Sequence, residues 1–179
     1  MGSGLYVCKR VNELLIKNKK EAYFWKRHFN KVPNKLHLIP NKAGRFNYRD
    51  SEIDDEFLYW ITSRIKVIDQ LDLDNTLVTN EGIKHLSTME AIRELRLKGC
   101  GGIDNGCMEY LNKITSLELL HLGSTSIDLD DLKELGLLQN LKLLLVSSGE
   151  SEAVIKEKVA VLKQMFPHCK MNVNHNIID

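Results

Sequence analysis

The residues best suited to nucleophilic catalysis lie in the second half of the chain. His121 is followed by Ser124 and Asp128, which are the residue types of a Ser-His-Asp triad. A triad needs its nucleophile, base and orienting acid within hydrogen-bond reach of one another. His121 falls in a predicted strand and Ser124 in the turn after it, and no G-x-S-x-G motif surrounds the serine. The sequence therefore predicts a protein that is not an enzyme.

The groups that could bind a metal or a cofactor are not spaced as such sites require. The six histidines show neither an H-x-x-x-H nor an H-E-x-x-H spacing. The acidic run at 128–131 lacks the glycine and the distal glutamate of a calcium loop, so we expect Asp128 or Asp130 to cap a helix instead. The glycines at 99–102 are not followed by the Lys-Ser/Thr of a phosphate-binding loop. We expect no metal and no cofactor.

The cysteines are candidates for redox chemistry. Cys8, Cys100, Cys107 and Cys169 form no C-x-x-C pair and do not have the spacing of a secreted disulfide framework, so reduced thiols are expected. Cys100 and Cys107 are the candidate redox thiols, provided that their sulfur atoms lie close enough to bridge. The alternative is that both are small buried hydrophobic residues.

An internal repeat predicts the elements that position these residues. A unit L-x-L-x-x-(N/C/T) begins at Leu71, Leu95, Leu120 and Leu144, which are 24, 25 and 24 residues apart. Apolar residues at near-helical spacing follow the first three units. This is the leucine-rich-repeat pattern, in which each unit gives a short parallel strand and then a helix. The predicted fold is therefore α/β: a short leucine-rich-repeat solenoid of about four strand–helix units with a parallel sheet.

The N-terminal part of the chain is expected to be a helical cap, because a repeat array exposes apolar edges at its ends. Residues 5–30 and 51–66 are predicted to be helices, and residues 31–50, with two prolines, an irregular loop. This divides the chain into a basic helical N-terminal segment and cap at 1–66 and a leucine-rich-repeat domain at 67–179.

The C-terminal end is predicted to close with one more strand–helix pair. Residues 152–166 have the pattern of a helix that Pro167 terminates. Residues 170–173 are expected to add a final strand, and residues 174–179 to form a loose tail.

The charge of the chain is unevenly distributed. Residues 1–50 contain twelve Lys and Arg against three Asp and Glu, whereas the net charge of the whole chain is +1. Aromatic and basic residues alternate in this segment, which suits an anionic membrane surface or a protein complex. Capping of the repeats and nucleic-acid binding are the alternatives, and we do not expect a nucleic-acid partner. The candidate contact residues are Lys17, Lys19, Lys20, Trp25, Lys26, Arg27 and Lys31.

The variable strand positions of the repeats should form a partner-binding concave face. The repeat places Asp72 beside Arg96, Asp74 beside Lys98, and Arg96 beside His121. These five residues are predicted to bind a protein partner. The alternative is a set of surface ion pairs that contribute little stability and contact no partner.

Two stretches of the chain are more specific than a general leucine-rich repeat. Phe24-Trp25 is followed by 29–32, Phe-Asn-Lys-Val, and the second repeat, 92–97, is followed by Cys100 and by 103–109. Together they resemble the mitochondrial ATP synthase subunit s or coupling factor B family, which includes related assembly factors of respiratory complexes. The order of helical segment, loop and four repeats is also similar. Members associated with coupling carry a C-x-C here, and this chain departs from it with a lysine, residue 98, at the first position.

The resemblance implies a non-catalytic peripheral protein on the matrix side of the mitochondrial inner membrane. It would be a subunit or an assembly or coupling factor of ATP synthase or another respiratory complex, and would serve ATP synthesis and proton transport. The repeats would bind the protein partner, and the basic segment would face the membrane or the complex. The alternative is a cytoplasmic leucine-rich-repeat adaptor that recruits substrates, as F-box proteins do, or another interaction scaffold. No F-box-like segment is apparent in residues 1–60.

Overall fold

The computed structural model describes residues 19–30 and 37–178. These residues belong to two compact units, Met1–Pro40 and Asn41–Asp179. In the first unit, residues 19–29 form a helix, which confirms part of the helix predicted at 5–30; residues 5–18 lie outside the described residues. The rings of Phe24 and Trp25 are buried and meet edge to face, with their centroids 5.0 Å apart.

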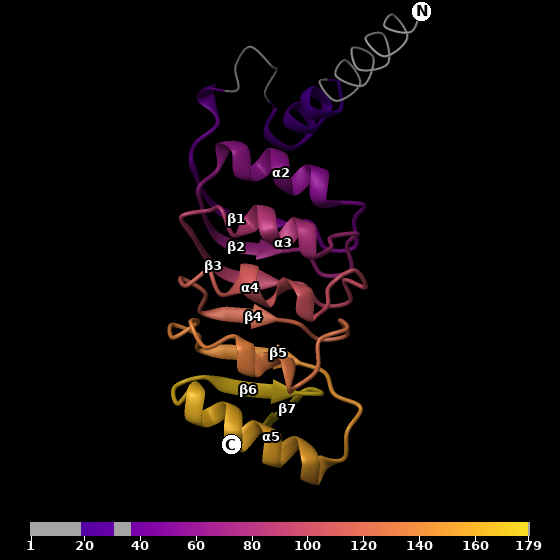
Figure 1. Cartoon of the computed structure of the whole chain (residues 1–179). Helices are drawn as coiled ribbons and strands as arrows, with labels where there is room; N and C mark the ends of the chain where they lie inside the picture. The colour runs from indigo at the N-terminus through magenta and orange to yellow at the C-terminus, as the bar shows by residue number, and fades with distance from the viewer. Residues whose placement is uncertain (1–18, 31–36, 179) are drawn as a thin grey trace, which may run out of the picture. The chain divides into compact units, whose positions relative to one another are not determined.

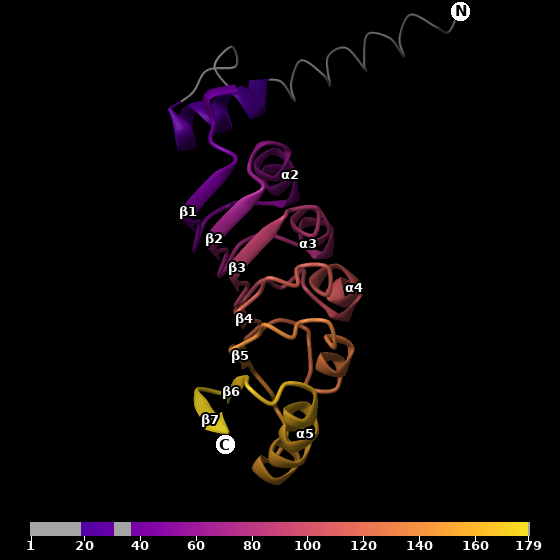
Figure 2. The same cartoon turned by 90° about the vertical axis from the view of Figure 1, so that its left-hand side faces the viewer.

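The second unit is an α/β structure on one seven-stranded sheet, with the strands in chain order (Figure 1). The first six strands are parallel and the last is antiparallel to its neighbour. The strands are Lys42–Asn47 (β1), Val67–Asp72 (β2), Ala91–Arg96 (β3), Leu119–His121 (β4), Leu143–Val146 (β5), Lys170–Val173 (β6) and Asn176–Ile178 (β7). The connecting elements are Asp55–Arg64 (α2), Asn80–Leu86 (α3), the 3₁₀ helix Asn105–Cys107 (η2), Met108–Leu111 (α4), the 3₁₀ helix Asp131–Glu134 (η3) and Glu152–Met165 (α5). Figure 2 shows that the strands lie on one side of this unit and the helices on the other.

The repeated leucines set the register of the sheet. Leu71 pairs with Leu95, Leu95 with Leu120, and Leu120 with Leu144. All four side chains are at most 1% exposed, and they form the core between the strands and the helices. The parallel strands predicted from the repeat are confirmed.

The loop predicted at 31–50 is wrong for its second half, because β1 occupies Lys42–Asn47. Phe46 pairs with Leu71, and Tyr48 continues the pairing by donating its backbone N–H to Asp72. β1 is thus a further strand of the same type, with aromatic residues where the later strands have leucines. The contact boundary lies at 40/41, whereas the sequence suggested 66/67. The predicted helical N-terminal cap is not supported, because a strand forms this edge of the sheet and α2 connects β1 to β2.

At the other end, α5 and β6 agree with the predicted helix and strand. The loose tail predicted after them is wrong, because residues 176–178 form β7. Val173 pairs with Asn176, and the two residues between them, Asn174 and His175, have φ of 52° and 68°. Two successive positive φ values are what a tight two-residue hairpin of the I′ type requires.

A left-handed residue recurs where the chain leaves the strands. Asp50, Asn75, Gly99 and Ser124 have φ of 55°, 55°, 71° and 56°. Glycine adopts this conformation without steric strain, and Asn and Asp tolerate it, whereas serine is less suited to it. Ser124 is exposed, and its conformation follows from the turn rather than from side-chain packing.

Substitution Ser124→Gly is expected to raise the free energy of unfolding by about 0.5–1 kcal/mol, because it relieves the strain of a positive φ without removing a buried contact. Urea denaturation would measure the change. Ser126→Gly is the control, since Ser126 is also exposed but has no positive φ, and this variant should lose stability. A gain in both variants, or a loss in both, would contradict the assignment of strain to Ser124.

Candidate functional site

The candidate site is the face of the sheet that the helices do not cover (Figure 2). Side chains alternate between the two faces of a strand, so outward residues alternate with the buried leucines. We use the name open face for the outward side chains of β1 to β5, together with the next outward side chain after each of β1, β2 and β3. Its members are Arg45, Asn47, Arg49, Gln70, Asp72, Asp74, Glu94, Arg96, Lys98, Leu119, His121, Leu143 and Leu145.

All five residues predicted to bind a partner belong to the open face. Asp72 is the register partner of Arg96, and Arg96 is the register partner of His121. Lys98 lies beside Asp74, because its backbone N–H donates to Asp74 Oδ1 over 2.8 Å. The strand neighbours expected from the repeat are therefore confirmed.

The ion pairs differ from those suggested by strand neighbours alone. Arg49 Nη2 lies 3.1 Å from Asp72 Oδ2 and 2.8 Å from Asp74 Oδ2, so one guanidinium joins both carboxylates. The hydrogen bond with Asp72, and the charges of both aspartates, raise the pKa of Arg49. Asp72 and Asp74 are only 6% and 1% exposed. Their carboxylates are thus internal supports of the open face rather than groups that a partner could reach.

Arg96 and Lys98 are the predicted residues that remain available. Both are half-buried, and neither side chain forms an ion pair within the described residues. Because the aspartates beside them are bound by Arg49, these two cations lack the counterions that the sequence suggested for them.

A row of ion pairs runs across the sheet beside these residues. Arg93 on β3 contacts Asp69 on β2, and also Glu94 and Glu118. Lys142 Nζ lies 3.0 Å from Glu118 Oε1. These pairs are partly exposed and support the sheet only weakly. One of them matters for the open face, because it gives Glu94, a member of that face, a counterion in Arg93.

His121 is half-buried between the charged and apolar parts of the open face. Its buried Nδ1 atom has no hydrogen-bond partner among the residues that the structure describes, and it lies 3.9 Å from Asp74 Oδ2. Asp128 does not orient it, because Asp128 Oδ1 accepts hydrogen bonds from the backbone N–H groups of Asp130 and Asp131 instead. The N-cap residue of η3 is Asp130, and its side chain makes no capping hydrogen bond. Burial lowers the pKa of His121; Asp74 opposes this shift, while Arg96, Lys98 and Arg49 add to it.

We expect His121 to titrate below its ordinary value of 6.5 in the folded protein. The unfolded chain then binds this proton more readily, so the stability contributed by neutral His121 is present above pH 6.5 and is lost as pH falls toward the lowered pKa. Titration of the His121 ring by NMR would measure the midpoint, and Arg96→Gln should move it upward. A midpoint at or above 6.5 would contradict the expected effect of burial.

The open face becomes apolar over β4 and β5. Leu119 pairs with Leu143, and His121 pairs with Leu145, and all four side chains are half-buried on the uncovered side. Apolar residues next to charged ones, on a face without helices, are typical of a protein-binding surface. The sequence interpretation assigned the repeat leucines to the core and missed these three.

Arg45 and Arg49 were also missed, because residues 31–50 were interpreted as a loop. A signal was present: Phe46 and Tyr48 stand 25 residues before Leu71 and Leu73, which is the spacing of the repeat. A search that allowed aromatic residues at the leucine positions would have found β1 and placed both arginines on the open face.

The basic N-terminal residues are only partly described. Lys17 and Lys31 lie outside the described residues, and Lys19, Lys20, Lys26 and Arg27 are exposed on the helix at 19–29. Trp25, which was also proposed as a contact residue, is fully buried, and its Nε1–H donates to Glu21 Oε1 over 3.1 Å. The cations of this helix are therefore accessible, but the tryptophan ring is not.

The candidate redox thiols are buried. Cys100 Sγ donates to the backbone oxygen of Leu73 over 3.1 Å, and Cys107 faces the core at the start of α4. Both are free thiols. Burial raises the pKa of Cys107 to about 12, which disfavours the reactive thiolate. These positions match the alternative of small hydrophobic core residues.

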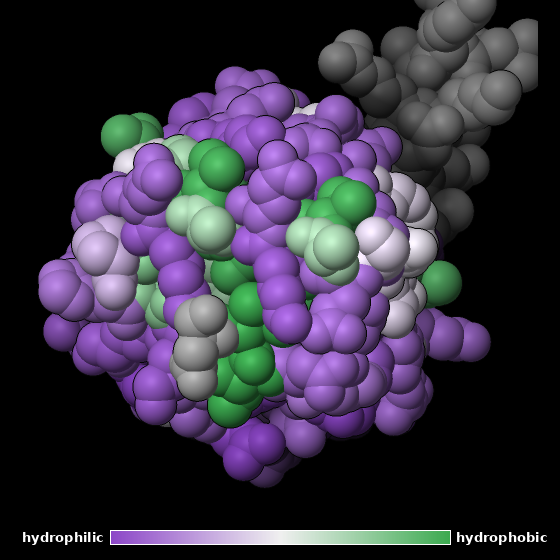
Figure 3. Space-filling view, turned by 90° about the horizontal axis from the view of Figure 1, so that it is seen from below, coloured by the Kyte–Doolittle hydropathy of each residue, from purple (hydrophilic) through white to green (hydrophobic). Residues whose placement is uncertain are grey.

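A separate groove of about 970 Å³ lies between α5 and the β6–β7 hairpin. Figure 3, which views this end of the unit, shows hydrophobic residues surrounded by hydrophilic ones. Ile155 and Val159 of α5, together with Val173 and Ile178, provide the apolar lining, and Lys156 adds charge. This groove shares no residue with the open face.

Within residues 19–30 and 37–178, no helix combines the length and apolarity needed to cross a bilayer. No group of three or more His, Cys, Asp or Glu residues in the same part of the chain could hold a metal ion. A comparison of the chain with models of known protein families found no match, and a search of curated proteins also found none.

Proposed function

We propose that this chain is a leucine-rich-repeat protein that binds a protein partner through the open face. It acts as a non-catalytic peripheral subunit or assembly factor of a mitochondrial inner-membrane complex, either ATP synthase or another respiratory complex. The observation that carries the proposal is the open face itself, where half-buried leucines adjoin Arg96 and Lys98, two cations that form no ion pair within the described residues.

The repeat supports the first part of this proposal. Six parallel strands follow one another in chain order, and the register between the repeats shifts by 24 or 25 residues from strand to strand. A left-handed residue follows four of the strands at the same position of the unit. Stacked strand–helix units of this length are what leucine-rich repeats form, and their uncovered strand faces bind partners.

The proposed location at the mitochondrial inner membrane rests on the basic N-terminal segment and on the resemblance in sequence to the ATP synthase subunit s family. The excess of Lys and Arg in residues 1–50 suits a surface of anionic lipid or an acidic complex. The four exposed cations of the helix at 19–29 are accessible for such a contact.

Native gel electrophoresis of mitochondria that express the tagged full-length chain tests the proposal. The wild type should migrate with a respiratory complex or with ATP synthase. Leu145→Glu should remove this migration, because it places a charge in the apolar part of the open face. Leu137→Glu should retain it, since Leu137 is 63% exposed and lies outside that face. A tagged chain that migrates alone, or equal behaviour of the two folded variants, would contradict the proposal.

Flotation with liposomes tests the membrane contact. Wild-type protein should float with cardiolipin-containing vesicles at low salt and less as salt rises, because the contact is electrostatic. Conversion of Lys19, Lys20, Lys26 and Arg27 to Gln should weaken the binding. Equal flotation of this variant, or no flotation of either protein, would leave the basic segment without a membrane role.

A further inference from the structure

We propose that the hollow on the open face between β1, β2 and β3 binds a carboxylate side chain from an acidic segment of a protein partner. This inference rests on the proposed function and adds the chemistry that the partner must present. We call this hollow the arginine hollow. It is lined by Arg45, Arg49, Gln70, Leu71, Asp72, Glu94 and Arg96.

The size of the arginine hollow restricts what can fill it. Its volume is about 260 Å³, whereas pockets for drug-sized ligands have volumes of about 300–1,000 Å³. It is also open to solvent along the sheet surface, so a chain lying across the strands can reach it. One short polar side chain fits, and a large cofactor does not.

Both carboxylates of the lining already have partners. Asp72 is bound by Arg49, with 3.1 Å between the guanidinium nitrogen and the carboxylate oxygen. Glu94 accepts from Gln70 Nε2 over 3.1 Å and lies 3.0 Å from Arg93 Nη1. Both carboxylates are therefore paired without Arg45 or Arg96.

Arg45 and Arg96 are the cations left over. Neither has an ion pair or a side-chain hydrogen bond within the described part of the chain. Arg96 is half-buried, so its charge is only partly solvated. A guanidinium binds a carboxylate through two parallel N–H···O bonds, which are stronger than bonds between neutral groups. Arg45 is exposed and Arg96 half-buried, so a bound carboxylate would give both arginines the ion pair that neither has within the described residues.

The net charge of the lining selects a carboxylate over a phosphate. Three arginines and two carboxylates leave one excess positive charge. A single carboxylate neutralises this excess, whereas a doubly charged phosphate would also be repelled by Asp72 and Glu94. Lys98 follows Arg96 by two residues on the same face and also forms no ion pair in the described part of the chain. A second acidic residue of the same segment can reach it, so the occupant is a run of acidic residues.

Arginine side-chain NMR of the full chain tests the arginine hollow directly. The probes are N-acetylated hexaglutamate, hexaglutamine and inorganic phosphate, each titrated at low salt. Hexaglutamate should shift the Nε–Hε signals of Arg45 and Arg96 saturably, and the other two probes should not. Arg45→Gln and Arg96→Gln should each weaken the affinity for hexaglutamate at least fivefold.

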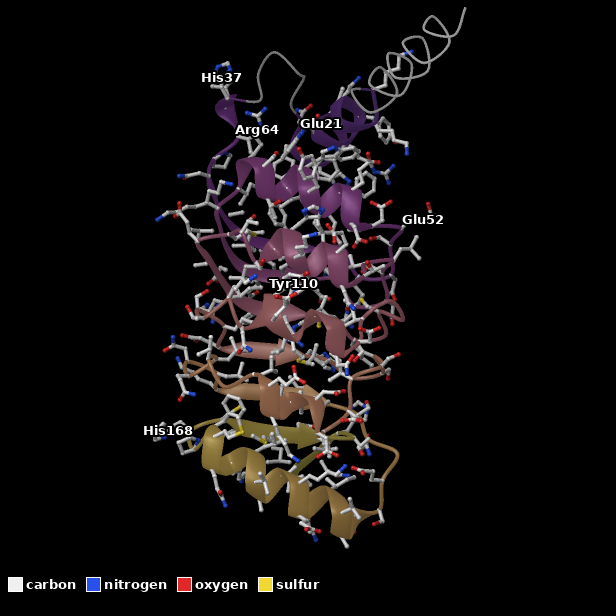
Figure 4. The ribbon with its side chains drawn as sticks, in the orientation of Figure 1. Glu21, His37, Glu52, Arg64, Tyr110 and His168 are labelled. Carbon is white, nitrogen blue, oxygen red and sulfur yellow. The ribbon has the colours of Figure 1, made fainter. Side chains whose placement is uncertain are left out.

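Arg64→Gln is the matched control, because it removes the same charge elsewhere. Arg64, labelled in Figure 4, is exposed at the end of α2, on the helix side of the sheet. This variant should change the affinity less than twofold. Equal weakening by all three variants, saturation by phosphate at the same arginines, or no saturable shift with hexaglutamate would each overturn the arginine hollow. Backbone NMR spectra of each variant confirm that it is folded.

The native-gel experiment separates this inference from the proposed function. If hexaglutamate binds as expected but the tagged chain migrates alone, the carboxylate site stands and the proposed function fails. If the chain migrates with the complex and hexaglutamate gives no saturable shift, the proposed function stands and the arginine hollow is overturned.

Discussion

Replacement of Asp74 by alanine is expected to lower the free energy of unfolding by about 2–3 kcal/mol. The carboxylate is 1% exposed and accepts from Arg49 Nη2 over 2.8 Å and from the backbone N–H of Lys98 over 2.8 Å. Its removal leaves a backbone donor unsatisfied between two strands and deprives Arg49 of its closest anion. The loss is smaller than for a fully buried ion pair, because the Arg49 side chain is 46% exposed and water can solvate it.

Urea denaturation of Asp74→Ala and of a control, Asp69→Ala, would measure this loss. Asp69 also pairs with an arginine, Arg93, but its side chain is 51% exposed. Solvent screens such a pair, so the control should lose much less stability. Equal losses in the two variants would show that burial of Asp74 is not what makes it important.

Substitution Gly99→Ala is expected to lower the free energy of unfolding by about 2–3 kcal/mol. Gly99 has a φ of 71°, which an L-residue adopts only with strain. An added Cβ would also collide with the Asn75 side-chain oxygen, which belongs to the preceding repeat and whose amide donates to Asp50 over 2.7 Å. The methyl group would therefore disturb a contact between repeats as well as its own turn.

Gly101→Ala is the matched control for Gly99→Ala. An added Cβ at Gly101 meets nothing within 4 Å, and its φ is not in the left-handed region. This variant should gain about 0.5 kcal/mol, because alanine restricts the unfolded chain. The double variant Gly99→Ala/Asn75→Gly should recover part of the loss. If thermal and urea unfolding show no difference between the two single variants, the turn at Gly99 is not under the constraint described.

The spacing of leucines was sufficient to predict the strands from β2 to β5 and their register. Leu71, Leu95, Leu120 and Leu144 recur at nearly constant intervals, and parallel strands with the same core contact must align these positions. β1 was not predicted, because Phe46 and Tyr48 stand in the place of leucines and the two prolines before them suggested a loop. β7 was not predicted, because its three residues, Asn176–Ile178, are too few to show the alternation of a strand.

The composition of the open face was predictable, but its contacts were not. Strand neighbours follow from register alone, and that placed Asp72 beside Arg96. Which arginine reaches a given carboxylate depends on side-chain length and direction across several strands. Arg49, which pairs with both Asp72 and Asp74, follows β1, a strand that the sequence did not predict. Because Arg49 pairs with Asp72 and Asp74, Arg96 in the arginine hollow has no ion pair within residues 19–30 and 37–178.

The order of the strands also determines how the second unit can unfold. Every strand is hydrogen-bonded only to strands that are its neighbours in the sequence. Each parallel pairing, from β1–β2 to β5–β6, therefore closes a chain segment of similar length at a similar entropic cost, whereas the β6–β7 hairpin closes only two residues. Folding can begin at any pair and spread in both directions, and unfolding can begin at either edge. Amide hydrogen exchange should accordingly slow from β1 and β7 toward β3 and β4, so that the apolar part of the open face lies next to the slowest-exchanging strands.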